Sequence, residues 1–386
     1  TFCHMDKLVT VGKDLLKNKP NLQNCYGMFA KCYELKNYIN EDPEIFKGSS
    51  SITSTNQMFF NCGKMLVGSN GINKLFDPLT KVTTIEFMFF GCSGMDMGLP
   101  NGLFAKNTSL RKMDGVFANC SKIRSIPDRL FRINITDTNN LSQLTQARNV
   151  FGGCSGIKGT VKKNFFDGAS KLLDIGYSCD TQEVFSGGGL IGMSYGFFGN
   201  TNLEGYHEEI LYPLTEVTNV SRLFYHSSGN ASLKYCYYTG SGGDVAYLNS
   251  ISYKIFNKNK SLRDISAMFQ NNTGLNGHIP SNLFEPCKST MTNVSHMFNG
   301  CNSLSGTDYD DNDSSGVKNV GISNKWFLNA KSLSNANGFL QNCSGFLSSE
   351  IPDDIFKGCT SLAHTAAFFN GCTSLTCSIP RGLFDS

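Results

Sequence analysis

The chain has 386 residues, with 34 basic and 31 acidic side chains and a net charge of +3. So small an excess gives no field of the kind that attracts nucleic acid, and no run of about 18 apolar residues is present, so we expect neither a nucleic-acid partner nor membrane insertion by this segment. Aromatic residues make up 12% of the chain, which excludes an intrinsically disordered protein.

A phrase with two adjacent apolar residues recurs along the chain. Its second apolar residue falls at positions 29, 59, 89, 117, 151, 198, 224, 269, 298, 340 and 369. In eight copies a cysteine follows three residues later: Cys32, Cys62, Cys92, Cys120, Cys154, Cys301, Cys343 and Cys372. The base period is about 28 to 30 residues, with insertions in four steps. Such a period is typical of a solenoid.

A second phrase, with proline in second place and an apolar pair at its end, alternates with the first. It occupies residues 99–104, 126–131, 279–284, 351–356 and 379–384. Each copy lies about half a period after a Met-Phe phrase, so each unit has two apolar corners. Because one unit of this length cannot enclose a core, the units must stack on one another as coils.

One unit, residues 110–131, predicts the local structure of a coil. Leu110, Met113, Val116 and Phe117 lie on one side of a short helix if the segment is helical. A very short strand is expected at about 121–126, and a turn through 127–129 follows because proline interrupts a strand. The fold class is therefore an α/β repeat solenoid, with a short strand plus a short helix or turns in each coil.

The regularity of the repeats varies along the chain and predicts three segments. Residues 1–175 form regular coils, and residues 176–260 form irregular repeats with Gly- and Tyr-rich insertions. Residues 261–386 return to repeat coils, with an acidic insertion at 305–322. We expect the three segments to make one continuous solenoid.

The two phrases also carry a family resemblance. The sequence Met-Phe-x-Gly-Cys-x-x-Leu at 297–304 and the phrase Ile-Pro-x-x-Leu-Phe resemble BspA-type leucine-rich repeats and related Met-Phe-x-Gly-Cys repeats. Those repeats belong to bacterial surface proteins and phage-associated proteins. The resemblance covers most of the chain and implies a curved leucine-rich-repeat solenoid used for adhesion or recognition, without a catalytic site.

The repeated cysteine has three readings. It can be a buried, reduced side chain that packs against its counterpart in the next coil, and we favour this reading because cysteine is often buried. It can form a disulfide between neighbouring coils, or it can bind zinc, although no matching pair of Cys-x-x-Cys motifs is present. The other seven cysteines share no common framework.

Catalytic residues are not predicted. The six histidines are scattered over different coils, and none has a nucleophile signature around it. Glu208 and Glu209 are adjacent, so their side chains should point apart in a solvated loop. The glycine run at 187–189 lacks the pattern of a phosphate-binding or dinucleotide-binding loop. We therefore expect no enzyme and no cofactor.

The acidic stretch at 308–313 is the one candidate metal site. It has four carboxylates in six residues, and calcium prefers several such oxygen ligands. However, the stretch does not match the EF-hand pattern, because it has no glycine at the sixth position of the loop and no glutamate at the twelfth. We expect a solvated acidic turn and keep calcium as the alternative.

The tyrosines are concentrated in one place. Eight of the 14 lie between residues 206 and 253, in the stretch that breaks the period. Tyrosine offers apolar contact and a hydroxyl group at a low entropic cost, so it is favoured at recognition surfaces. We predict Tyr235, Tyr237 and Tyr238 as ligand-binding residues. The alternative is that they pack an irregular part of the solenoid.

Two classes of function remain. The first is adhesion or receptor recognition, with a host protein or a glycan as ligand, on a microbial surface or a phage particle. The second is a structural component that docks onto a larger assembly such as a virion or a surface layer. We expect a cell-surface, extracellular or virion location, although the sequence has no visible signal peptide.

Overall fold

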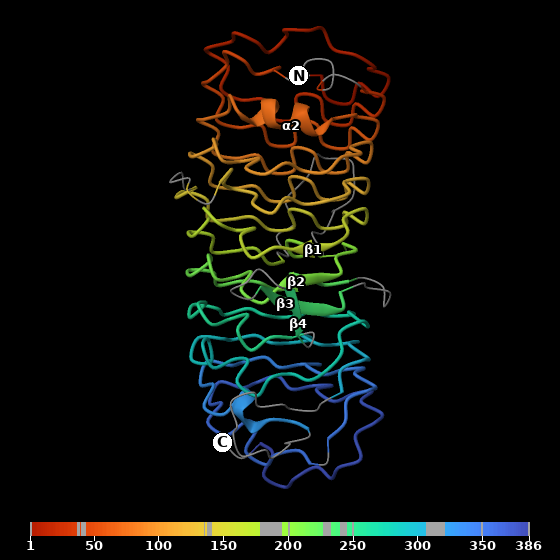
Figure 1. Ribbon diagram of the computed structural model, residues 1–386, viewed down its shortest axis with the longest axis vertical. Helices are drawn as coiled ribbons and strands as arrows, with labels where there is room; N and C mark the ends of the chain where they lie inside the picture. The colour runs from red at the N-terminus through yellow and green to blue at the C-terminus, as the bar shows by residue number, and fades with distance from the viewer. Residues whose placement is uncertain are drawn as a thin grey trace. The chain divides into compact units, whose positions relative to one another are not determined.

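The computed structural model describes all residues except 1, 37–38, 40–43, 135, 137–140, 178–194, 200, 227–232, 240–244, 249–250, 306–320, 349 and 385–386. The chain divides into two compact units, Thr1–Asn202 and Leu203–Ser386. Within each unit the backbone winds as stacked coils (Figure 1). Each unit is therefore a repeat solenoid, as the alternating phrases predict. The division into three segments stays a prediction.

At the Met-Phe phrase, which we call the first corner, two kinds of backbone hydrogen bond alternate. The N–H groups of Phe87, Phe89 and Gly91 donate to carbonyl groups of the next coil, at 2.8 to 2.9 Å. The N–H groups of Met88 and Phe90, which lie between them, donate to carbonyl groups three residues earlier in their own coil. Each donor is satisfied in one direction or the other, which a buried backbone requires.

This alternation shows that the helix predicted at 110–117 is wrong. The N–H groups of Met113 and Phe117 donate to Gln146 and Val150 in the next coil, both at 3.1 Å. An α-helix would need those donors for carbonyl groups four residues earlier. Gly115 also has a left-handed φ of 57°. The spacing of three between apolar residues therefore reflects consecutive turns.

The strand predicted at 121–126 is reduced to one parallel bridge, between Ser125 and Gly98. Bridges of this kind replace strands in most described coils, for example from Asn24 to Ser54 and from Ser54 to Thr84. Regular structure in the described residues includes the helix α2 (Ser69–Phe76), the short 3-10 helix η1 (Asn324–Trp326) and the strands β1 (Thr160–Val161), β2 (Gly205–His207), β3 (Tyr235–Thr239) and β4 (Val245–Leu248). An α/β description thus overstates the helix and strand content.

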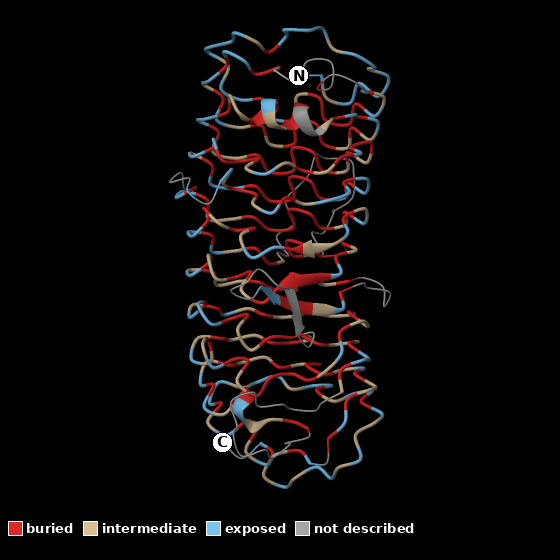
Figure 2. Ribbon diagram, in the orientation of Figure 1, coloured by how far each residue is buried: buried red, intermediate tan, exposed pale blue. Residues whose placement is uncertain are grey.

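The first-corner phenylalanines form the core of each unit. Phe117 is fully buried, and its ring stacks on Phe89 and Phe151 at centroid distances of 5.8 Å. In the second unit Phe269 stacks on Phe298 at the same distance. Buried residues recur in the coils of each unit, and exposed residues lie mostly at the bends (Figure 2). The predicted phenylalanine core is confirmed.

The glycine of the Met-Phe-x-Gly-Cys phrase has a steric reason. Gly91 has a φ of +71°, and a Cβ atom there would lie 2.1 Å from Oδ1 of Asn61 in the preceding coil. Gly300 has a φ of +77°, and its Cβ would lie 2.5 Å from Oδ1 of Asn271. Left-handed backbone favours Gly and Asn. An asparagine in one coil therefore favours glycine in the next.

Candidate functional site

The repeated cysteines form a ladder of buried thiols in each unit. All eight are buried, and all are free thiols. Sγ of Cys92 donates to the carbonyl of Phe59 at 3.0 Å, and Sγ of Cys154 donates to Phe117 at 3.0 Å. In the second unit Cys301 donates to Phe269 at 3.1 Å. Each of these thiols thus adds a second hydrogen bond to a core carbonyl of the preceding coil, which already accepts a backbone N–H from its own coil.

Burial also suppresses the reactivity of these thiols. It raises the pKa of Cys154 and of Cys301 to about 12, because the charged thiolate would lose its hydration. The thiolate is the species that attacks electrophiles and binds metals. The ladder is therefore suited to packing and hydrogen bonding, which agrees with the buried-thiol reading.

Sequence reasoning missed two further members of this pattern. Cys359 lies three residues after Phe356 of the second corner, and its Sγ donates to the carbonyl of Phe327 at 3.0 Å. Asn272 stands where other coils have cysteine, and its Nδ2 donates to Phe224 at 2.7 Å. The expectation that the other cysteines share no framework is wrong for Cys359. The signal was the offset of three residues from the corner phenylalanine.

A buried ion pair links two coils of the first unit. Asp114 is 1% exposed. Its carboxylate accepts hydrogen bonds from the backbone N–H and from Nε of Arg148, both at 2.8 Å. Nη2 of Arg148 also lies 2.8 Å from the carboxylate. The pair therefore links two adjacent coils of the first unit.

The predicted tyrosines lie on β3. This strand pairs in parallel with β2, with Tyr237 opposite His207, and antiparallel with β4, with Thr239 opposite Val245. Tyr237 is only 5% exposed and meets the ring of His207 edge-on at 5.1 Å. Tyr238 is 37% exposed, and Tyr235 is half-buried. The structure thus brings the three together on one strand but leaves Tyr238 as the outward member.

Beside this strand lies a buried carboxylate that we expected in a solvated loop. Glu208 is 3% exposed, so that expectation is wrong. Its carboxylate accepts a hydrogen bond from Oγ of Ser252 at 3.0 Å and pairs with Nζ of Lys254 at 3.0 Å. Its backbone N–H donates to the carbonyl of Tyr237 at 2.9 Å. Glu208 is buried because β3 and the 252–254 segment both supply partners.

Two tyrosines outside the predicted set lie close to that ion pair. Lys254 Nζ is 5.7 Å from the ring centre of Tyr253. The hydroxyl of Tyr212 accepts a weak hydrogen bond from Nδ2 of Asn257 at 3.5 Å. Glu208, as the hydrogen-bond partner, raises the pKa of Lys254 and so holds its charge. A fixed ammonium group flanked by half-buried tyrosines is suited to binding polar ligands that also have an apolar face.

The candidate metal site and the glycine run of the sequence cannot be placed in the part of the chain that the structure describes. There, no group of three or more His, Cys, Asp or Glu residues could hold a metal ion. The acidic stretch at 308–313 and the glycine run at 187–189 lie outside the described residues. The described helices also include none long and apolar enough to cross a membrane.

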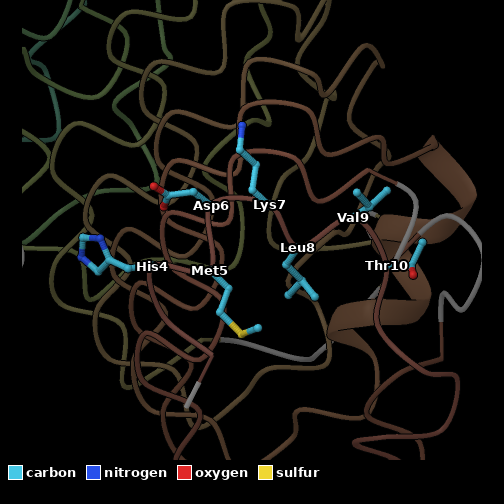
Figure 3. A pocket seen from close by; sticks show the side chains of 7 residues that line it. All are labelled: His4, Met5, Asp6, Lys7, Leu8, Val9 and Thr10. Atoms are coloured by element: carbon cyan, nitrogen blue, oxygen red, sulfur yellow. The ribbon is translucent and has the colours of Figure 1, made fainter.

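A cavity of about 620 Å³ lies at the first residues of the first unit, lined by His4, Met5, Asp6, Lys7, Leu8, Val9 and Thr10. Figure 3 shows Met5 and Leu8 pointing the same way and Lys7 pointing the opposite way. All the lining residues are consecutive. The cavity is therefore the inside of one bend and does not gather polar groups from several coils.

A family model described as "Mycoplasma protein of unknown function, DUF285" matches residues 23–164 and 249–341. The chain belongs to this family. The matched ranges include the first corners at Phe29 to Phe151 and at Phe269 to Leu340. No curated protein matches the chain.

Three solved structures were also found to be similar. One is a chain of the Toll–Spatzle complex from Drosophila, at 15% identity and a TM-score of 0.35, with 92% of this chain and 45% of that chain covered. Another is a leucine-rich repeat protein from Bacteroides ovatus, at 14% identity and a TM-score of 0.32, with 95% of this chain and 69% of that chain covered. The third is a leucine rich cell surface protein from Faecalibacterium prausnitzii, at 15% identity and a TM-score of 0.18, with 79% of this chain and 85% of that chain covered. The chain thus spans less than half the length of the Toll-complex chain.

Proposed function

We propose that the chain is a non-enzymatic recognition solenoid of the BspA type, carried on a microbial surface or a phage particle, that binds a protein or a glycan. One observation carries the proposal. Tyr238 is exposed on β3, while its neighbours Cys236 and Tyr237 are buried and fix the strand. An aromatic side chain on a rigid strand loses little entropy on binding.

The surroundings of β3 support the same location. Tyr212, Tyr253 and Lys254 lie in the same irregular stretch, and the buried Glu208 fixes Lys254. In the regular coils the repeated residues are committed to packing, whereas an irregular stretch can add new surface without disturbing the core. The binding surface that we propose therefore centres on Tyr238, with Tyr235 at its edge and Tyr237 as the support beneath.

The test is a binding screen of the full chain against a glycan array and a panel of extracellular-matrix proteins. We expect Tyr238→Ser to keep the melting temperature within a few degrees and to abolish the strongest signal. Tyr33→Ser is the matched control, because Tyr33 is 43% exposed and lies in the other unit. Tyr237→Ser should lower the melting temperature instead.

If Tyr238→Ser binds like the unmodified chain, or if Tyr33→Ser loses binding equally, the tyrosine surface is not the recognition site. In that case a structural role in a larger assembly becomes the better explanation. A pull-down from that assembly would then identify the partner.

A further inference from the structure

One part of the second unit has a first corner rich in amides and free of acidic and strongly basic side chains. The segments 265–271, 293–300 and 335–342 contain no Lys, Arg, Asp or Glu in 23 residues, whereas 17% of the whole chain is charged. We call them the amide corner. They hold eight amide side chains: Gln270, Asn271, Asn293, Asn299, Asn335, Asn337, Gln341 and Asn342. The same positions of the first unit include Glu86 and Lys112.

Backbone hydrogen bonds place the three segments in adjacent coils. The N–H of Ala267 donates to the carbonyl of Ser295 at 2.8 Å. A parallel bridge joins Asn293 to Asn335. Backbones bonded in this way lie about 4.8 Å apart, so the amides recur at that interval along the stack. Asn342 is exposed and the other seven amides are half-buried, so the solvent reaches all eight.

Hydrogen bonds restrain several of these amides. Nδ2 of Asn299 donates to Oε1 of Gln341 at 3.1 Å, and Oδ1 of Asn335 accepts the N–H of Asn337 at 3.0 Å. An amide side chain has two N–H donors and two acceptor lone pairs. Nδ2 of Asn335 and Nε2 of Gln341 have no hydrogen-bond partner among the described residues. The corner therefore holds amides that are already oriented and still have donors to offer, which lowers the entropy cost of binding.

The charged groups near the amide corner lie at its borders and have both signs. Arg263 and Asp264 directly precede the first segment, and Arg222 lies in the coil before it. Lys260 and Lys331 are exposed and lie four to five residues ahead of a segment. A charged ligand would therefore meet ionic partners only beside the amides.

His296 is the one titratable side chain within the three segments. Burial lowers the pKa of His296, and Arg222 adds to this effect, whereas a hydrogen bond with Gln341 opposes it. The imidazole is thus neutral near pH 7. It lies against Gly338 of the next coil, where a Cβ atom would be 2.4 Å from Nδ1. The corner itself therefore carries no charge at neutral pH.

The side chains indicate which ligand suits this surface. Protein interfaces depend on large anchors such as Tyr, Trp and Arg. The amide corner lies within the described part of the chain and has no exposed large hydrophobic side chain. A sugar hydroxyl both donates and accepts hydrogen bonds, as an amide does. A polymer of neutral sugars repeats such groups at regular intervals, and the coils repeat the amides.

We propose that the amide corner binds a neutral, unbranched polysaccharide. Its hydroxyl groups exchange hydrogen bonds with Gln270, Asn335 and Gln341, and the polymer runs along the stack from one coil to the next. The inference goes beyond the recognition role proposed for Tyr238, because it uses first-corner amides and none of the tyrosines of β3.

The test measures binding of the full chain to three fluorescein-labelled β-1,4-linked hexasaccharides, of glucose, mannose and xylose, by fluorescence anisotropy. We expect the unmodified chain to bind at least one of them with a Kd below about 1 mM. The variant N335D/Q341E keeps the shapes and acceptor oxygens of both side chains but removes their N–H donors. It should weaken binding by at least about tenfold.

The control N21D/Q23E makes the same change in net charge at exposed amides of the first unit. It should bind within about twofold of the unmodified chain. Melting curves accompany each variant. If N335D/Q341E melts well below the unmodified chain, Gln341→Met, which has a similar length and adds no charge, takes its place and should also weaken binding.

Binding of none of the three probes, or equal losses in the two double variants, would overturn the proposal. So would binding that falls steeply between about 50 and 500 mM NaCl, or displacement of the probe by dextran sulfate but not by dextran, because both would indicate a charged contact. Normal binding by N335D/Q341E together with lost binding by Tyr238→Ser would assign the saccharide to the tyrosine surface instead. Failure of this inference is thereby distinguished from failure of the proposed function.

Discussion

The two units use the same backbone corner with different side chains. One residue after the corner phenylalanine, the first unit has Ala30, Phe60, Phe90 and Ala118, which form a buried apolar cluster with Phe87. The rings of Phe60 and Phe90 stack at 5.0 Å. At the same position the second unit has the polar residues Tyr225, Gln270, Asn299, Gln341 and Asn370, which are half-buried or exposed.

The amides of the second unit bond to one another along the stack. Nδ2 of Asn299 donates to Oε1 of Gln341 at 3.1 Å, and Nδ2 of Asn342 donates to Oδ1 of Asn299 at 3.4 Å. The corner accommodates either apolar or amide side chains at this position, because its backbone N–H groups already donate to the next coil and to its own turns. Side chains at this position therefore set stability or surface chemistry without changing the fold.

Charge separates the units in the same way. The first unit has 22 basic and 16 acidic residues, a net charge of +6, and the second has 12 and 15, a net charge of −3. The tyrosine surface that we propose lies in the acidic unit. The repeat supplies the scaffold, and the variable positions give each unit a different surface.

The largest expected effect tests what the units share. Phe117→Ala in the first unit and Phe269→Ala in the second should each lower the free energy of unfolding by roughly 3 to 5 kcal/mol, because both rings are fully buried between stacked neighbours. The exposed Lys122→Ala should change little. Thermal and urea melts give the comparison. A small loss for Phe269→Ala alone would mean that the second unit depends on a different core.

The next effect tests where the units differ. Phe90→Gln should cost about 2 to 3 kcal/mol, because it removes a buried ring and places an amide in an apolar cluster. Gln270→Phe should change stability by less than about 1 kcal/mol, because the position is half-buried. Urea melts of the two variants measure the asymmetry. Equal costs would show that the amide ladder is as strongly coupled to the core as the aromatic cluster.

The smallest effect concerns pH and should be common to both units. The folded chain keeps the protons of Cys154 and Cys301 up to a pKa of about 12, whereas an unfolded thiol loses its proton near pH 8.5. Their contribution to stability is therefore complete below about pH 8.5. It is lost above that value by about 1.4 kcal/mol per pH unit for each thiol.

Unfolding measured from pH 7 to about pH 10 under reducing conditions tests this expectation. Cys154→Ala and Cys301→Ala should each make the free energy of unfolding fall less steeply with pH, by about 1.4 kcal/mol per pH unit. An unchanged slope in either variant would mean that the thiol is not shielded in the folded unit. Alkylation before and after denaturation gives an independent measure of the same shielding.

The sequence alone determined the period, the two corners and the buried phenylalanines. These features depend on which side chains recur at which spacing, and a repeat displays that spacing directly. It also indicated that Cys62, Cys92 and the other phrase cysteines are buried, since a small residue in a fixed place beside a core phenylalanine has few alternatives. The crowding of tyrosines between 206 and 253 was visible in the same way.

The tertiary structure decided the features that depend on the neighbouring coil. The turns at 110–117 replace the predicted helix because every second N–H group donates to a carbonyl group of the next coil. The sequence of one repeat does not show which hydrogen bonds its backbone forms with the next repeat. Tyr237 and Tyr238 are adjacent in sequence, yet the pairing of β3 buries one and exposes the other. The sequence specifies each coil, but stacking specifies which residues share a surface.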